Sequence, residues 1–139
     1  MIADIGHAAF ATHDLERCLA FYAQLGLHET FRLHHPDGRV MLVYLHVAGD
    51  RFIEVFAGGF APDAEQRGSY RHLCLLTDDL QAAVQRLQSL GVAIESGPLV
   101  GLDHNWQAWI RDPDGNAIEL MQLAENSPQR QAARAEATS

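Results

Sequence analysis

Two histidines and two glutamates recur at one constant spacing, and together they are able to hold a metal ion. His7 and His72 stand 65 positions apart, and so do Glu54 and Glu119. Each Glu has aliphatic neighbours in a β-rich segment, where a carboxylate is costly to bury unless it is paired or bound to a cation. Two imidazoles and two carboxylates suit Ni, Co, Mn, Fe(II) or Zn better than Ca or Mg. We therefore treat these four residues as candidate ligands of one divalent metal.

The same offset relates many other positions, so the chain is interpreted as a duplicated unit. The matched pairs outside the four candidate ligands are Thr12 and Thr77, Asp14 and Asp79, Leu15 and Leu80, and Leu25-Gly26 and Leu90-Gly91. We predict repeats at residues 4–60 and 69–124 with a linker at 58–68, so that residues 1–124 form a single domain. The tail at 125–139 has helical composition but no apolar stripe, and it is expected to be loose.

Each repeat shows the pattern of a βαβββ module. A short strand carries the His, a helix follows with apolar residues at helical spacing, and three strands complete the half. In the first half we predict strands at 5–11, 29–34, 40–48 and 51–56, and in the second half at 70–76, 92–95, 105–110 and 116–122. Thr and Asp precede each helix as N-caps, and Gly26 and Gly91 follow it. The predicted fold class is α+β, with two tandem modules.

Composition excludes several classes of function. The 139 residues carry a net charge of -8, which disfavours binding to nucleic acid. All ten basic residues are Arg, so a Schiff-base lysine, pyridoxal phosphate chemistry and a P-loop are excluded. No apolar run is long enough to span a membrane, and no signal peptide is evident. We expect a cytoplasmic protein that binds neither membrane nor nucleic acid, with both cysteines reduced.

Four further residues are weaker candidates for substrate binding. His104 and Trp106 lie in a predicted loop or strand start, where binding residues are often found. Arg111 precedes the turn 112–115, and Cys74 follows His72 by two positions on the same strand face. Surface or core roles remain open for all four.

The residues also resemble a known family, the vicinal oxygen chelate superfamily, over about residues 4 to 124. The segments that carry the likeness are Gly6-His7, 14–27, and Asp112-Pro113-Asp114-Gly115-Asn116 through Ile118-Glu119-Leu120. This superfamily includes glyoxalase I, fosfomycin-resistance proteins, extradiol dioxygenases and methylmalonyl-CoA epimerase. The resemblance implies paired βαβββ modules that form a cup-shaped sheet around a metal, and a homodimer.

Within this superfamily the ligand set is most similar to that of bacterial glyoxalase I. The resemblance places His7, Glu54, His72 and Glu119 on the four ligand positions. It also places Ala11 and Gly58 where glyoxalase I has an Arg and an Asn that contact glutathione. A glyoxalase-like lyase or isomerase is therefore predicted, with a substrate other than a glutathione adduct.

The predicted reaction moves a proton on a small substrate that has two neighbouring oxygens. Bound metal would acidify the adjacent C–H, and Glu54 or Glu119 would act as the general base. Two alternatives stay open. One is an Fe(II) ring-cleaving dioxygenase that uses His7, His72 and Glu119, and the other is a non-catalytic binding or resistance protein of the bleomycin-resistance kind.

Overall fold

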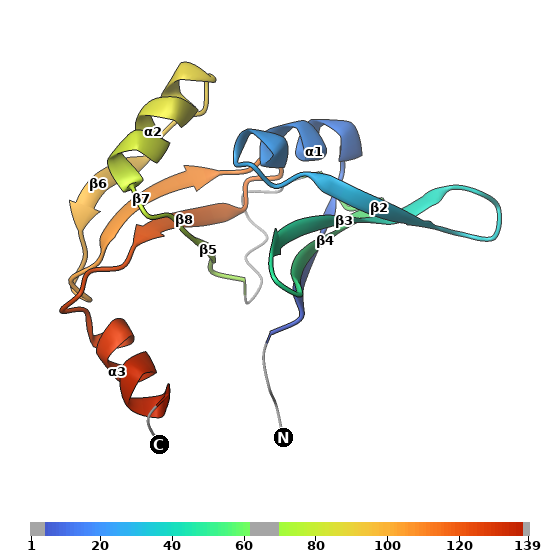
Figure 1. Cartoon of the computed structure of the whole chain (residues 1–139). Helices are drawn as coiled ribbons and strands as arrows, with labels where there is room; N and C mark the ends of the chain where they lie inside the picture. Colours follow the sequence, from blue (N-terminus) through green and yellow to red (C-terminus); the bar gives the residue numbers. More distant parts are fainter. Residues whose placement is uncertain (1–4, 62–69, 138–139) are drawn as a thin grey trace. The chain divides into compact units, whose positions relative to one another are not determined.

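The structure, a computed structural model, describes residues 5–61 and 70–137 (Figure 1). The chain divides into two units, one formed by residues 1–67 and 112–115 and the other by residues 68–111 and 116–139. Each unit contains a four-stranded sheet and a helix in βαβββ order, so the predicted α+β class with two tandem modules is confirmed. Most of the predicted linker 58–68 lies outside the described residues.

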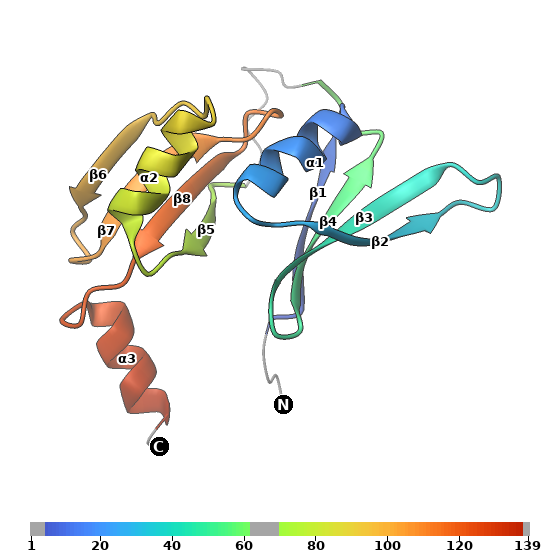
Figure 2. The ribbon, with the colours of Figure 1, turned by 45° about the horizontal axis from the view of Figure 1, so that its top comes forward.

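Unit 1 holds one mixed sheet with strand order β1-β4-β3-β2. Its elements are β1 (His7–Thr12), α1 (Leu15–Gln24), β2 (Glu29–His34), β3 (Val40–Ala48) and β4 (Arg51–Ala57). The strands β1 and β4 run parallel, and the other neighbouring pairs are antiparallel. Figure 2 shows α1 lying across one face of this sheet.

Unit 2 repeats this topology with strand order β5-β8-β7-β6. Its elements are β5 (Leu73–Leu76), α2 (Leu80–Ser89), β6 (Ser96–Val100), β7 (Trp106–Arg111), β8 (Ala117–Gln122) and α3 (Pro128–Ala137). The strands β5 and β8 are parallel, and α2 packs against β6, β7 and β8.

The hydrophobic core of each unit lies between the helix and one face of the sheet. In unit 2 the helix face carries Ala108, Ile110 and Ile118, all fully buried, together with Leu80 and Leu87 of α2. Because side chains alternate along a strand, the residues between these positions point to the opposite face. That second face, which we name the open face, carries the candidate chemistry.

Both helices start and end as the repeat predicts. Asp14 accepts a hydrogen bond from the backbone N–H of Arg17 (3.1 Å), and Asp79 accepts one from Ala82 (2.9 Å). These bonds satisfy backbone donors that the first helical turn leaves unpaired. The glycine after each helix has a positive φ, 82° at Gly26 and 83° at Gly91, which only glycine adopts without strain.

Three predicted elements of unit 2 differ from the structure. The strand predicted at 92–95 is absent, and β6 lies at 96–100, where a loop was expected. Val92 is instead buried just after α2. Pro98 is accepted in β6 because β6 is an edge strand with a pairing irregularity between Ser96 and Leu99. The strand predicted at 70–76 is shorter and begins only at Leu73.

The tail predicted to be loose contains helix α3. Buried Ser127 caps this helix, because its hydroxyl accepts a hydrogen bond from the N–H of Arg130 (3.2 Å). Glu125 forms ion pairs with Arg130 (3.4 Å) and Arg134 (2.5 Å). The described side chains of α3 are mostly exposed, so the N-terminal cap and these ion pairs, rather than an apolar face, stabilise the helix. None of the helices in the described part of the chain has the length and apolarity needed to cross a bilayer.

Candidate functional site

The first candidate pair of ligands lies on the open face of unit 1. His7 begins β1 and Glu54 occupies the middle of the neighbouring strand β4, where Ala9 is its register partner. The His7 Nε2 atom lies 3.5 Å from the Glu54 Oε2 atom, with the Glu54 side chain 8 % exposed and the His7 ring 50 % exposed. Small side chains at Ala9 and Ala11 share the face with His7. The carboxylate is thus almost buried while the imidazole remains accessible.

The second pair has the same arrangement in unit 2. His72 lies just before β5, and Glu119 lies in the middle of β8. The His72 Nε2 atom is 3.1 Å from the Glu119 Oε2 atom, and the Glu119 side chain is again 8 % exposed. Within the described residues of either unit, no third His, Cys, Asp or Glu completes a metal-binding group. The structure therefore forms two equivalent His–Glu pairs from the four predicted ligands, one pair in each unit.

An aromatic residue stands opposite each of the two glutamates on the next strand. Tyr44 on β3 pairs with Glu54, and Trp109 on β7 pairs with Glu119. Hydrogen bonding to the Glu54 carboxylate raises the pKa of the Tyr44 hydroxyl. The Trp109 ring contacts the His72 ring edge to face, with centroids 4.9 Å apart. These aromatics restrict the orientation of a carboxylate in one unit and an imidazole in the other.

The two pairs have a donor set that fits a divalent metal. Both carboxylates lie in the central part of a strand, almost out of contact with water, and each has an imidazole nitrogen as a neighbour. Buried carboxylates need a cation or hydrogen-bond donors for compensation, and imidazole nitrogen with carboxylate oxygen suits first-row divalent ions. Within each unit, the imidazole and the carboxylate of its own pair are the groups that would contact such an ion.

The four weaker candidates are separated by the structure. Arg111 lies at the end of β7 and lines a pocket beside His72, whereas Trp106 begins β7 and is 47 % exposed. His104 lies in the exposed loop before β7, with a positive φ of 67°. Cys74 pairs in register with Glu119, and burial followed by the charge of Glu119 raises the pKa of its thiol to about 12. Cys74 is therefore protonated at neutral pH.

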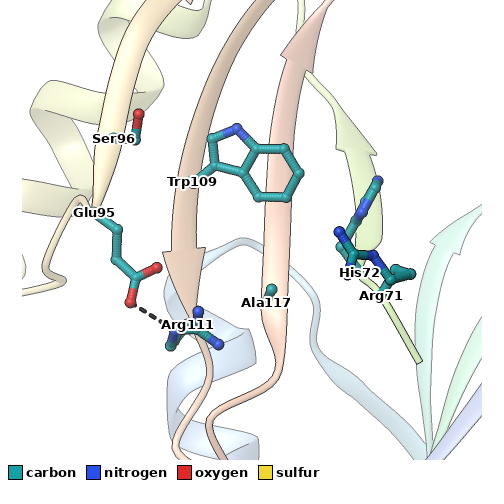
Figure 3. A pocket seen from close by; sticks show the side chains of 7 residues that line it. All are labelled: Arg71, His72, Glu95, Ser96, Trp109, Arg111 and Ala117. Carbon is teal, nitrogen blue, oxygen red and sulfur yellow. Dashed lines mark hydrogen bonds and ion pairs between the residues drawn. The ribbon is translucent and has the colours of Figure 1, made fainter. Parts of the chain in front are cut away.

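Sequence reasoning did not find Arg71, Glu95 and Ser96, which also line the pocket beside His72. The position of Arg71 directly before the candidate ligand His72 could have indicated a residue of the site. The sequence predicts Glu95 at the end of a strand and Ser96 at the start of a loop. In the structure β6 begins at Ser96, and both residues line the pocket. Figure 3 shows Glu95, Arg111, Trp109, Ala117, His72 and Arg71 around this space.

Comparison with known proteins identifies the family. Residues 4–120 match the family described as the Glyoxalase/Bleomycin resistance protein/Dioxygenase superfamily. The chain belongs to this superfamily. The resemblance found in the sequence is thereby confirmed.

Individual members of the superfamily are similar at low sequence identity. A protein of Vibrio cholerae serotype O1 named as a probable lactoylglutathione lyase is 27 % identical over 122 residues, which cover 84 % of this chain and 88 % of that protein. The crystal structure of SMU.1112c has a TM-score of 0.76 at 25 % identity and covers 88 % of this chain and 100 % of its own. TnmS3, an antibiotic-binding protein from Streptomyces sp. CB03234, has a TM-score of 0.71 at 29 % identity, and the match covers 88 % of this chain and 98 % of the TnmS3 chain.

Proposed function

We propose that this member of the superfamily is a metal-dependent, glyoxalase-like isomerase or lyase that acts on a small molecule with two neighbouring oxygens. The observation that carries the proposal is the presence of two equivalent pairs, His7–Glu54 and His72–Glu119, with both carboxylates nearly buried. Similarity to proteins named lactoylglutathione lyase supports the reaction class.

The chemistry follows from what these residues can hold and move. A divalent ion bound by the two pairs would supply Lewis acidity to the substrate oxygens. A Glu54 or Glu119 carboxylate that accepts a proton from one carbon can return it to the neighbouring carbon. A hemithioacetal would become a 2-hydroxy thioester in this way, with no atom gained or lost. The near burial of both carboxylates keeps water from competing for the proton.

Glutathione is not the expected thiol. The two positions that contact glutathione in glyoxalase I are Ala11 and Gly58 in this chain, and neither has a polar side chain. Both lie close to the C-terminal ends of β1 and β4 in unit 1. We also propose a homodimer, as the family resemblance implies, and a cytoplasmic location, as expected from the composition of the chain; native mass spectrometry tests the dimer.

The first experiment measures the metal content of the purified, never-chelated protein by plasma mass spectrometry. About one equivalent of Ni, Co, Zn, Mn or Fe per chain is expected. Isomerisation of methylglyoxal hemithioacetals is then assayed with several thiols. Glu119→Gln should abolish turnover and weaken metal retention, whereas Glu16→Gln, at an exposed position of α1, should change neither. Unchanged turnover in Glu119→Gln would contradict the proposed mechanism.

A second candidate function is non-catalytic binding of a small molecule. The observation that favours it is the similarity to TnmS3, which is described as an antibiotic-binding protein. A protein of this kind would bind a ligand tightly and release it unchanged. Absence of bound metal after reloading, together with absence of turnover for every hemithioacetal tested, would favour this function over the isomerase. Oxygen uptake with a catechol would instead favour the dioxygenase.

A further inference from the structure

Unit 2 contains a pocket on its open face, next to His72 (Figure 3). Its volume is about 420 Å³, which falls in the range typical of sites for small molecules. The side chains that line it come from the segment before β5, from β6 and β7, and from Ala117 at the start of β8. All of the residues that line it belong to unit 2.

The pocket is open because β8, which lies between β5 and β7, has a small residue at this point. Ala117 pairs with Arg111 across β8 and β7, and it lies between Arg111 and the segment that carries His72. In unit 1 the position equivalent to Ala117 is Phe52, which pairs with His46. The Phe52 ring lies 5.2 Å from the His46 ring and 5.8 Å from the Tyr44 ring. Aromatic packing therefore occupies in unit 1 the place that is open in unit 2.

Two guanidinium groups give the pocket its chemical character. The repeat offset aligns Arg71 with Gly6 and Arg111 with His46, so both arginines are particular to unit 2. Arg111 Nε donates to Glu95 Oε1 at 2.7 Å, which anchors its side chain at the rim. Arg71 has no ion pair among the described residues. Among the charged residues that line the pocket, two arginines and one glutamate leave one positive charge, and the nearby Glu119 carboxylate is paired with His72.

A flat ring completes the pocket wall. The Trp109 indole N–H donates to Gln107 Oε1 (2.8 Å), and the ring contacts His72 edge to face. An indole fixed in this way offers an apolar surface next to the two cations. Guanidinium groups bind carboxylates and phosphates through paired hydrogen bonds, more favourably than they bind neutral groups.

We propose that this pocket binds an oxyanion, a carboxylate in the first instance, on a small molecule whose apolar part lies against Trp109. The inference rests on the proposed function for one point only, which is that the same molecule presents its reacting oxygens to the His72–Glu119 pair of the same unit. The substrate of this protein would then carry a negatively charged group that is separate from the reacting carbon. The binding of the anion itself is independent of any turnover.

The test measures binding of three matched probes to the full chain by NMR. The probes are 3-phenylpropionate, its neutral amide, and 2-phenylethylphosphonate, titrated into the protein as purified and again after treatment with a chelator. The chain has two Trp residues, so the indole cross-peak of Trp109 reports on the pocket and that of Trp106 serves as an internal reference. We expect the carboxylate to bind about tenfold more tightly than the amide.

Variants separate the pocket from general charge effects. Arg71→Gln and Arg111→Gln should each remove most of the preference for the anion. Arg86→Gln makes the same charge change at an exposed position of α2, the helix that covers the other face of the sheet. This variant should keep the preference for the anion. Ala117→Phe, which copies the residue of unit 1, should abolish binding of all three probes. The dispersion of the NMR spectrum shows whether each variant is folded.

The outcomes decide the proposal. Equal affinity for the carboxylate and the amide, or a preference that survives in both arginine variants, would overturn it. Tighter binding of the phosphonate than of the carboxylate would support the oxyanion pocket and assign it to a phosphate group. Turnover of a methylglyoxal adduct with the neutral thiol 2-mercaptoethanol tests the proposed function separately. Turnover without anion preference defeats only the pocket, and anion preference without turnover defeats only the isomerase.

Discussion

The hydroxyl of Tyr22 on α1 donates a hydrogen bond of 2.9 Å to the carboxylate of Asp112, which lies 90 positions further along the chain. Both groups are almost completely buried. Asp112 opens the turn between β7 and β8, and its carboxylate also accepts from the backbone N–H of Asp114 (2.9 Å). The turn 112–115 thus belongs to unit 1, although the strands on either side of it belong to unit 2. Buried hydrogen bonds between side chains explain this assignment.

Removal of this bond should destabilise the protein. Tyr22→Phe leaves a buried carboxylate with one donor fewer, so the free energy of unfolding should fall by about 1–3 kcal/mol. Urea unfolding followed by circular dichroism measures the loss. Tyr70→Phe is the matched control, because the Tyr70 hydroxyl donates to the carbonyl of Ala117 at an exposed site. An equal loss in the two variants would contradict the role given to Asp112.

Asp114 should make stability depend on pH in the acid range. Burial alone raises the pKa of Asp114, but hydrogen bonds from the Thr12 hydroxyl, the His13 N–H and the His13 ring outweigh it and hold the pKa below its usual value. A carboxyl with a lowered pKa in the folded state stabilises that state above its unfolded pKa, about 4. The contribution is lost as pH falls through the folded pKa.

Asp114→Asn tests this dependence. The free energies of unfolding of the wild type and the variant should differ at pH 6, and the difference should shrink as the pH is lowered to 3. Asp50→Asn, in the exposed turn after β3, is the control and should show no such change. A difference between wild type and Asp114→Asn that stays constant from pH 6 to pH 3 would show that the carboxylate charge is not responsible.

Neither cysteine should react readily in the folded protein. Cys18 is fully buried, and burial raises the pKa of its thiol to about 12; the pKa of Cys74 is also about 12. Because the thiolate is the reactive form, iodoacetamide at pH 7.5 should label neither residue until the protein is unfolded. Mass spectrometry of intact protein measures the labelling. Ser89→Cys, at the exposed end of α2, provides a thiol that should be labelled at once.

Tyr44 should hold the Glu54 carboxylate in place for metal binding. Tyr44→Phe removes the hydroxyl that bonds to this carboxylate, so metal should be lost to a competing chelator at a lower chelator concentration. A reduction in affinity of about tenfold is expected, because neighbours that orient a ligand contribute at least that much. Tyr70→Phe, whose hydroxyl bonds to a backbone carbonyl, should retain the wild-type affinity. Equal metal retention in both variants would remove Tyr44 from the site.

The sequence was sufficient for the repeated architecture, because its signals are local. Asp14 and Asp79 bond to backbone groups three residues ahead, and Gly26 and Gly91 adopt a conformation that few other residues accept. Because successive side chains of a strand point to opposite faces, Glu54 lies on the other face of β4 from Ile53 and Val55, and Glu119 lies on the other face of β8 from Ile118 and Leu120. These features depend on neighbours in the chain, so their spacing predicted them.

Tertiary structure alone decided the features that depend on distant contacts. The register of edge strand β6 follows from its pairing with β7, which brings Glu95 within bonding distance of Arg111. The pocket beside His72 depends on the small side chain of Ala117 in β8, which is the register partner of Arg111 in the neighbouring strand β7. The place of the turn 112–115 in unit 1 follows from the bond between Tyr22 and Asp112. Local sequence propensity does not predict such pairings, because the stabilisation of each residue comes from contact with a residue that is far away in the sequence.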